Sequence, residues 1–193
     1  MDDVDRILDT ALLLQVQAGV ASAFEELIAR HHGGLRYFAR RLVADSAAAD
    51  DVVQETWLAA VRQAKLIRSG AAFRVWLYRV AHNRAMSHLR GSRTRSVVSV
   101  DKVEDLPEAD AETLDDESIR AEEAADVHRA LGRLSLEHRE ILTLRFMEEM
   151  TYDEMAAVLG CSVGTIRSRL FYGKKQLLRI MQESPLVSYG DSR

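Results

Sequence analysis

Residues 151–175 read TYDEMAAVLGCSVGTIRSRLFYGKK, a stretch typical of two short helices joined by a tight turn. Thr151 and Glu154 have the spacing of a capping box, which predicts that the first helix begins here. Gly160 predicts its end, since glycine readily adopts the left-handed conformation found at helix C-termini. Ser162 is a favoured N-cap residue for the second helix. The stretch therefore predicts a helix-turn-helix.

The second of these helices has two chemically different faces. Its apolar residues recur with helical spacing and predict one buried stripe, at Val163, Ile166, Leu170 and Leu177. The other face carries side chains that suit phosphates or base edges: Thr165, Arg167, Ser168, Arg169, Tyr172 and Lys174. Residues 155–182 hold five Lys or Arg and no acid. This pattern favours a DNA-reading helix, and an ordinary helical hairpin with a solvated basic face is the alternative.

The charges of the chain are segregated along its length. Its 193 residues are 47% apolar, enough for one or two domains with cores of their own. The net charge of −4 argues by itself against nucleic-acid binding. However, residues 56–100 hold nine Lys or Arg and no acid, whereas residues 101–126 hold twelve acids and two bases. Such blocks predict a basic binding surface and a separate acidic strip.

Helical spacing and only two prolines predict an all-α fold of two small helical domains joined by a flexible acidic linker. The C-terminal domain is expected to contain four helices, including the helix-turn-helix, with Ile141, Leu142, Leu144 and Phe146 in its core. In the N-terminal domain, Gly33-Gly34 predicts a kink and Ser69-Gly70 a flexible loop. The expected boundaries are residues 1–95 for the N-terminal domain, 96–118 for the linker, 119–182 for the C-terminal domain and 183–193 for a tail.

Several classes of protein find no support in the sequence. Cys161 is the only cysteine, so no intramolecular disulfide is possible, and we expect a small buried residue. His31 and His32 are expected at the surface, and no metal or cofactor is predicted. A hydrolase or metal enzyme built on these two, His82 and His88 lacks the required motifs. No apolar run resembles a signal peptide or a membrane span, so we expect a soluble, cytoplasmic protein without membrane insertion.

An acidic group lies on the helix expected over residues 45–63. Asp50, Asp51 and Glu55 form it, with Asp51 and Glu55 one turn apart. Acids near a helix N-terminus complement the helix dipole. A docking face for a basic partner is the functional alternative, and the residues alone leave both open.

The helix expected over residues 73–90 mixes basic residues with aromatics and an amide, which suits phosphate contact together with base stacking. A solvated basic helix is the alternative, but the lack of acids over residues 56–100 favours nucleic acid. We expect Trp76 in the core and Tyr78 available to DNA. The basic residues are Arg74, Arg79, Arg84 and Arg90, interleaved with Tyr78, His82 and Asn83.

With these stretches in order, the whole chain resembles a bacterial sigma factor of the extracytoplasmic-function (ECF) group of the sigma-70 family. DSAAADDVVQETWLAAVR at 45–62 is similar to the family's segment that docks on the clamp helices of the largest RNA polymerase subunit. FRVWLYRVAHNRAMSHLRGSRTR at 73–95 resembles the segment that reads and melts the −10 promoter element. LSLEHREILTLRFMEEMTYDEMAAVLGCSVGTIRSRL at 134–170 resembles the −35-reading domain, which also touches the flap of the second-largest subunit.

The resemblance implies a promoter-specificity subunit and not an enzyme. Its partners would be core RNA polymerase, promoter DNA and, as is usual in the family, an anti-sigma factor. Polymerase contacts are implied at Asp50, Asp51, Gln54 and Glu55. Contacts with the −10 element are implied at Lys65, Arg68 and Ser69, in a loop that receives a flipped base, and at Arg74, Tyr78, Arg79, Asn83, Arg84 and Arg90. Contacts with the −35 element are implied at Ser162, Thr165, Arg167, Ser168, Arg169, Phe171, Tyr172 and Lys174.

The chain departs from the family pattern in two helices. Ser87 stands where the melting helix often has an acid, and Tyr172-Gly173-Lys174 replaces an Arg-Ala-Arg run in the recognition helix. The second departure bears on which −35 sequence is read. A stand-alone helix-turn-helix regulator is the alternative function, and it would bind an operator without polymerase, usually as a dimer.

Overall fold

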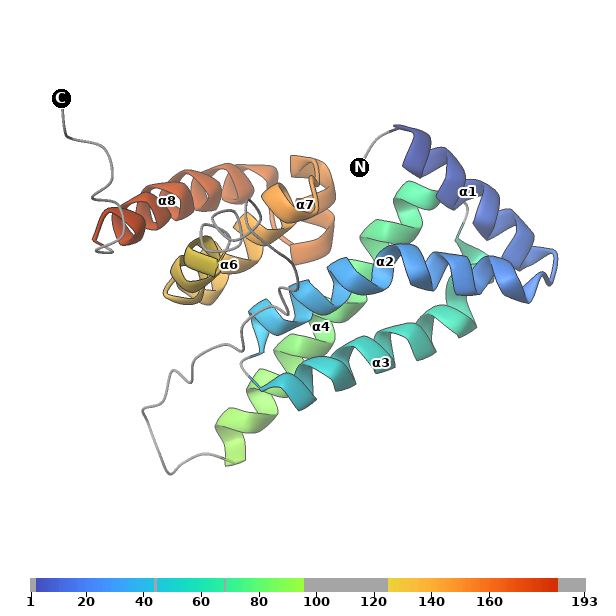
Figure 1. Ribbon diagram of the computed structural model, residues 1–193, viewed down its shortest axis with the longest axis horizontal. Coiled ribbons are helices and arrows are strands. Elements are labelled where there is room, and N and C mark those ends of the chain that lie inside the picture. The colour runs from blue at the N-terminus through green and yellow to red at the C-terminus, as the bar shows by residue number, and fades with distance from the viewer. Residues whose placement is uncertain (1–2, 44, 68, 96–124, 184–193) are drawn as a thin grey trace, which may run out of the picture.

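The computed structural model describes residues 3–43, 45–67, 69–95 and 125–183, and these residues form helices and no strand. The all-α prediction is therefore confirmed. Figure 1 shows two groups of helices, one from each half of the chain, packed against each other. The predicted linker and most of the predicted tail lie outside the described residues.

The N-terminal group surrounds a core to which every helix contributes. Leu13, Leu27, Phe38, Phe73 and Leu77 are among its fully buried side chains. Helix α2 is central, since it touches all the other helices of the group and also reaches α6 of the C-terminal group. The elements are α1 (Asp3–Gln17), α2 (Ala21–Leu42), α3 (Ser46–Gln63), the 3-10 turn η1 (Ala64–Leu66) and α4 (Gly70–Arg95).

The C-terminal group contains the predicted helix-turn-helix. Thr151 Oγ1 accepts the N–H of Glu154, and the Glu154 carboxylate accepts the N–H of Thr151, which completes the capping box. Gly160 has φ +65° and ends the first helix, and Ser162 caps the second. The elements are a helix over residues 125–132, α6 (Leu136–Leu142), the π-helical turn η2 (Thr143–Met147), α7 (Tyr152–Leu159) and α8 (Val163–Gln182).

The core of the C-terminal group contains three of the four apolar residues predicted for it. Ile141, Leu142 and Leu144 are buried as predicted, but Phe146 is 51% exposed, so its predicted place in the core is wrong. It lies in the π-helical turn η2 and, together with Leu142, lines an apolar groove at the surface of the C-terminal group. Cys161 is half-buried against the core, close to the expectation.

Helix α2 runs unbroken through the two glycines and differs from its prediction at one histidine. It continues through Gly33-Gly34 without interruption, so these glycines do not end the helix. A Cβ on Gly34 would lie only 2.7 Å from the Tyr78 hydroxyl, so this glycine allows α4 to approach closely. His32 is exposed as expected, but His31 is buried against α1, which contradicts its predicted surface position.

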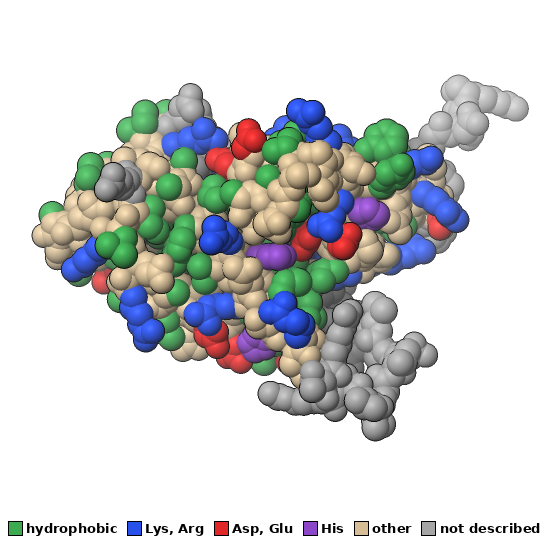
Figure 2. Space-filling view, turned by 180° about the vertical axis from the view of Figure 1, so that it is seen from behind, with side chains coloured by type: hydrophobic (Ala, Val, Ile, Leu, Met, Phe, Trp, Pro, Cys, Tyr) green, Lys and Arg blue, Asp and Glu red, His purple; other side chains and the backbone are tan. Residues whose placement is uncertain are grey.

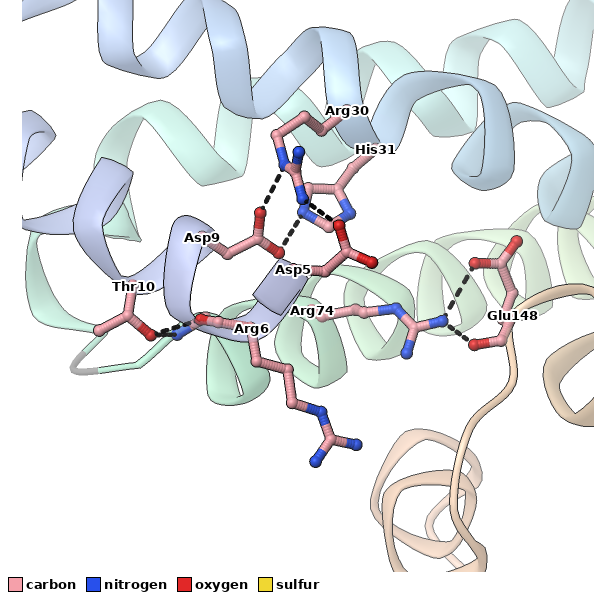
Figure 3. A network of polar contacts seen from close by, with 9 residues as sticks. Asp5, Arg6, Asp9, Thr10, Arg30, His31, Arg74 and Glu148 are labelled. Atoms are coloured by element: carbon pink, nitrogen blue, oxygen red, sulfur yellow. Dashed lines mark hydrogen bonds and ion pairs between the residues drawn. The ribbon is translucent and has the colours of Figure 1, made fainter. Parts of the chain in front are cut away.

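The burial of His31 is explained by a charged cluster that joins α1 to α2 (Figure 3). Asp9 is fully buried, and its carboxylate lies 2.8 Å from both Arg30 Nε and His31 Nε2. Burial by itself raises the pKa of Asp9, but hydrogen bonds and charge interactions with His31 and Arg30 outweigh it, so the pKa lies below its ordinary value. An ionised carboxylate can only accept hydrogen bonds. Nε2 of His31 is therefore the donor and carries the proton.

The start of α4 is fixed by α1 rather than being flexible. Helix α4 begins at Gly70, three residues earlier than expected. Gly70 N donates to Thr10 Oγ1 at 2.9 Å, and that hydroxyl donates to Arg6 O at 2.7 Å. Gly70 therefore belongs to the helix and not to the predicted loop, since this glycine serves a close helix contact.

Candidate nucleic-acid and protein interfaces

The outward face of α8 carries most of the residues predicted for −35 contacts. Arg167 and Ser168 are exposed, and Phe171 and Tyr172 are 65% and 57% exposed. Spacings of three and four residues place these side chains next to one another on the helix. Lys175 is also exposed and follows Ser168 by two turns on the same face. This lysine is not among the predicted contacts, although its spacing alone places it on this face.

Two predicted basic residues border this face instead of standing in its middle. Arg169 lies 3.1 Å from the Glu137 carboxylate and 3.6 Å from that of Glu140, which draws it towards α6. The Lys174 ammonium lies 5.6 Å from the centre of the Phe146 ring. Both side chains are therefore held in place by contacts within the C-terminal group.

The first turn of α8 is organised by its cap. Ser162 Oγ accepts the N–H of Thr165 at 3.1 Å and lies 2.9 Å from the Thr165 hydroxyl, so these two predicted residues engage each other. Arg167, one turn further, has its guanidinium 6.0 Å from the centre of the Tyr152 ring. This cation–π contact limits the directions that the Arg167 side chain can take.

Helix α4 presents a polar stripe to solvent. Arg79, Asn83 and Arg90 are exposed, and spacings of four and seven residues place them on one side of the helix. Arg84, next to this stripe, forms an ion pair with Glu55 of α3. Thus one ion pair connects a residue predicted to contact DNA with a residue predicted to contact polymerase.

The structure describes only part of the loop that is predicted to receive a flipped base. Lys65 lies exposed in η1. Ser69 Oγ accepts the N–H of Ala72 at 3.2 Å and so caps α4. Arg68 lies outside the described residues.

Two predicted −10 residues are not accessible in this structure. Arg74 is 4% exposed and Tyr78 is 1% exposed. The Arg74 guanidinium donates to the backbone carbonyl of Glu148 and lies 3.4 Å from its carboxylate (Figure 3). The Tyr78 ring packs on Phe38 with ring centres 5.4 Å apart, whereas Trp76 is only partly buried. The expected accessibility of Tyr78 is therefore wrong, because this side of α4 is covered by α2 and by Glu148 of the C-terminal group.

The environment of Tyr78 keeps its hydroxyl protonated. Burial, followed by the charge of Glu148 and a hydrogen bond to it, raises the pKa of Tyr78 well above its ordinary value. The neutral hydroxyl therefore donates to the Glu148 carboxylate.

Helix α3 presents its predicted acidic residues on the surface. Asp51 and Gln54 are exposed, and Asp50 is exposed beside Arg36, whose Nε donates to it at 3.1 Å. Glu55, the fourth predicted residue, is the one held by the ion pair to α4 described above. Three of the four predicted side chains thus remain open to a partner.

Two apolar residues extend this surface of α3. Leu58 and Val61 are each more than half exposed. Together with Asp51 and Gln54 they are spaced three, four and three residues apart, which gives one continuous stripe. Neither residue is among the predicted contacts, because an amphipathic helix normally turns its leucine and valine residues inward.

The C-terminal group also has an apolar groove of about 260 Å³. Lys174 and the exposed Phe146 are among the residues that line it. Its other lining residues include Val127, Leu131, Leu142, Leu177 and Met181.

Figure 2 shows Lys and Arg side chains scattered over one whole face of the molecule, with apolar side chains between them.

Other kinds of site find no support in the part of the chain that the structure describes. Among the described residues no three His, Cys, Asp or Glu side chains gather as metal ligands would. None of the described helices combines the length and the apolar character that a membrane crossing requires.

Comparison with solved structures identifies the fold. CnrH, solved in complex with the cytosolic domain of CnrY, aligns with a TM-score of 0.64 at 26% identity, and the alignment covers 92% of this chain and 99% of CnrH. RpoE from Bartonella quintana, solved with the anti-sigma factor NepR, aligns with a TM-score of 0.66 at 26% identity and covers 83% and 98%. Both relatives were solved with a protein partner.

Comparison with known sequences identifies the family. Residues 27–95 match sigma-70 region 2, and residues 124–177 match sigma-70 region 4. The RNA polymerase sigma-H factor of Pseudomonas aeruginosa is 35% identical over 181 residues, or 90% of this chain and 94% of that protein. The ECF RNA polymerase sigma-E factor of Escherichia coli is 32% identical over 190 residues, or 95% and 98%. The chain therefore belongs to the ECF group of the sigma-70 family of RNA polymerase sigma factors.

Proposed function

We propose that this alternative sigma factor, which directs RNA polymerase to promoters, divides its work between three surfaces. The outward face of α8 reads the −35 element, the exposed stripe of α4 contacts the −10 element, and the stripe on α3 docks on polymerase. We assign residues 1–95 and 119–182 to its two domains, on the pattern of the sequence. The observation that carries the proposal is the open, acid-free face of α8 behind a capped helix-turn-helix.

Recognition of the −35 element fits the geometry of α8. A recognition helix contacts base edges with side chains near its N-terminus, which is where Arg167 and Ser168 stand exposed. Lys175 and Tyr172 follow further along and are suited to phosphate contacts. Because this single face is small, we expect it to bind promoter DNA weakly without core polymerase. A gel-shift experiment with and without polymerase measures the difference. A stand-alone regulator, the alternative function, would bind its operator equally in both.

Replacing Arg167 with alanine should weaken promoter binding at one −35 base pair. A bidentate arginine contact discriminates by roughly 1–3 kcal/mol, so the loss should concentrate at one position of the site. The measurement is the affinity of the polymerase–sigma complex for a promoter set varied at each −35 position. Arg179→Ala removes an exposed charge further along the same helix and serves as the control. An equal loss across all sequences would mean that Arg167 holds phosphate and does not read a base.

Docking on polymerase is assigned to the α3 stripe. It combines the exposed Asp51 with the exposed Leu58 and Val61. An acidic rim next to apolar residues gives both electrostatic steering and a desolvated centre for a protein partner. The partner face is expected to be basic, and the clamp helices of the largest subunit are the proposed site.

The double substitution Asp51→Lys with Leu58→Ala should weaken binding to core polymerase by roughly tenfold or more, since it removes both contributions. Competition against the unmodified protein for core polymerase measures the effect. Glu26→Lys reverses an exposed charge on α2 and should change the affinity little. Equal affinity of the double variant and the control would reject α3 as the docking surface.

Two further partners follow from the family and the surface. The apolar groove bounded by Phe146 and Leu177 is a suitable seat for the flap of the second-largest subunit. Because the relatives CnrH and RpoE were each solved with a partner, we also assign this chain an anti-sigma factor. The sigma factor itself would act in the cytoplasm, and it would act by binding, without catalysis. Co-purification from cells, with polymerase subunits and a small inhibitor as the expected companions, tests both partners.

A further inference from the structure

We propose that Tyr152 is a positioning residue of promoter recognition, because the face of its ring directs the Arg167 guanidinium towards one base pair of the −35 element. The inference rests on the proposed function, since it assumes that the outward face of α8 reads this element. It gives the first helix of the helix-turn-helix a part in sequence discrimination, in addition to its support of α8.

The position of the Tyr152 ring is set at the start of α7. Tyr152 is the first residue of this helix and directly follows Thr151, whose capping box with Glu154 fixes the first turn. The side chain is half-buried and packs against the core of the C-terminal group. The ring therefore presents a face whose place is determined by the fold before any DNA is bound.

Two guanidinium groups lie near this ring. The distance from the ring centre is 5.6 Å for Arg145 of η2 and 6.0 Å for Arg167 of α8. The negative face of an aromatic ring attracts both cations. Arg145 is also tied to the backbone, since its Nη1 donates to Met150 O at 2.8 Å. Arg167 is exposed and is therefore the one of the two that is available to DNA.

The way in which Arg167 is held differs from that of two other arginines on α8. Arg169 lies 3.1 Å from the Glu137 carboxylate. Arg179 Nε lies 2.8 Å from the Glu183 carboxylate. Among the described residues Arg167 forms no such ion pair. A carboxylate occupies the N–H donors of a guanidinium, whereas a ring attracts its charge and leaves the donors free for a bidentate contact with a base edge.

This arrangement bears on specificity more than on total affinity. A long arginine side chain loses rotational freedom when it binds a base, and a direction that is already restricted reduces this loss. Without the ring, the Arg167 guanidinium could turn to the phosphates as well as to the base edge. Phosphate contacts carry no sequence information, so the affinity would be kept in part while discrimination falls.

The test replaces Tyr152 in the full chain and measures binding of the polymerase–sigma complex to promoters varied at each −35 position. Tyr152→Leu removes the aromatic face but keeps an apolar side chain, whereas Tyr152→Phe keeps the ring and is the matched control. Tyr152→Leu should reduce discrimination at the base pair read by Arg167 by roughly two- to fivefold, the factor that corresponds to an exposed cation–π contact. Discrimination at the other positions should stay unchanged, and Tyr152→Phe should behave as the unmodified protein.

The double variant Tyr152→Leu with Arg167→Ala separates positioning from other roles. Without the arginine the ring has nothing to direct, so Tyr152→Leu should cause no further loss in this background. Discrimination is a ratio of two affinities of one preparation, so an unfolded fraction of a variant cancels out. Equal losses at all −35 positions, a further loss in the Arg167→Ala background or a loss for Tyr152→Phe would each overturn the inference, since the residue would then support the fold or touch DNA itself.

The same measurements distinguish the inference from the proposed function. If Arg167→Ala loses discrimination at one base pair and Tyr152→Leu does not, the inference is wrong and the reading of the −35 element by α8 stands. If Arg167→Ala loses affinity equally on all sequences, the base reading by Arg167 and the inference fail together.

Discussion

Replacing Asp9 with asparagine should lower the free energy of unfolding by about 3–5 kcal/mol, because it breaks a buried charged cluster on one side only. The Asp9 carboxylate is fully buried and accepts from both Arg30 and His31. An amide of the same shape keeps one acceptor oxygen but carries no charge. Chemical denaturation at neutral pH measures the loss.

Asp5→Asn is the matched control, since Asp5 accepts from the same Arg30 at 2.8 Å but its side chain is 44% exposed. Exposed ion pairs contribute roughly 0–1 kcal/mol, so this variant should stay close to the unmodified protein. Equal losses for the two variants would show that the Asp9 cluster does not hold α1 to α2.

The Asp9 cluster also predicts how stability responds to acid. Because the folded-state pKa of Asp9 is depressed, the stability that its carboxylate contributes is fully present above the unfolded-chain pKa of about 3.9. It is lost as the pH falls through the lower pKa of the folded state. The stability difference between the unmodified protein and Asp9→Asn should therefore be constant from neutral pH down to about pH 4 and shrink below it.

Gly70→Ala should destabilise the protein by about 3 kcal/mol, the upper end of the range for overpacking, because the new methyl group meets backbone atoms that cannot turn aside. A Cβ at this position would lie 2.7 Å from Arg6 O, 2.9 Å from Thr10 N and 2.5 Å from Asp9 Cβ. Thermal or chemical unfolding measures the effect.

Gly91→Ala on the same helix is the control, since a Cβ there meets nothing within 4 Å. Alanine in a helix is favoured over glycine by roughly 1 kcal/mol, so this variant should be neutral or slightly stabilised. If both substitutions behaved alike, close packing of α4 on α1 would not be the reason for the glycine.

Local signals in the sequence were enough to predict much of this molecule. The capping box at Thr151, the glycine at Gly160 and the cap at Ser162 act within one helical turn, so their geometry follows from neighbouring residues alone. Helical spacing likewise identified the α8 face, because its exposed and buried residues alternate with one regular period.

The incorrect expectations share a different cause. The burial of His31 depends on an acid twenty-two residues away, and the position of Tyr78 depends on Glu148 in the other half of the chain. The sequence favours a kink at Gly34 and a flexible loop at Gly70, whereas in the structure both glycines make room for another helix. Such long-range contacts leave no periodic signal, so they became apparent only from the three-dimensional arrangement.

The contact between the two helical groups couples their stabilities. The Tyr37 hydroxyl of α2 and His128 Nδ1 of the C-terminal group lie 2.8 Å apart, although 91 positions separate them in the chain. A substitution that unfolds one group also removes contacts from the other, so the two halves of the chain lose their structure together.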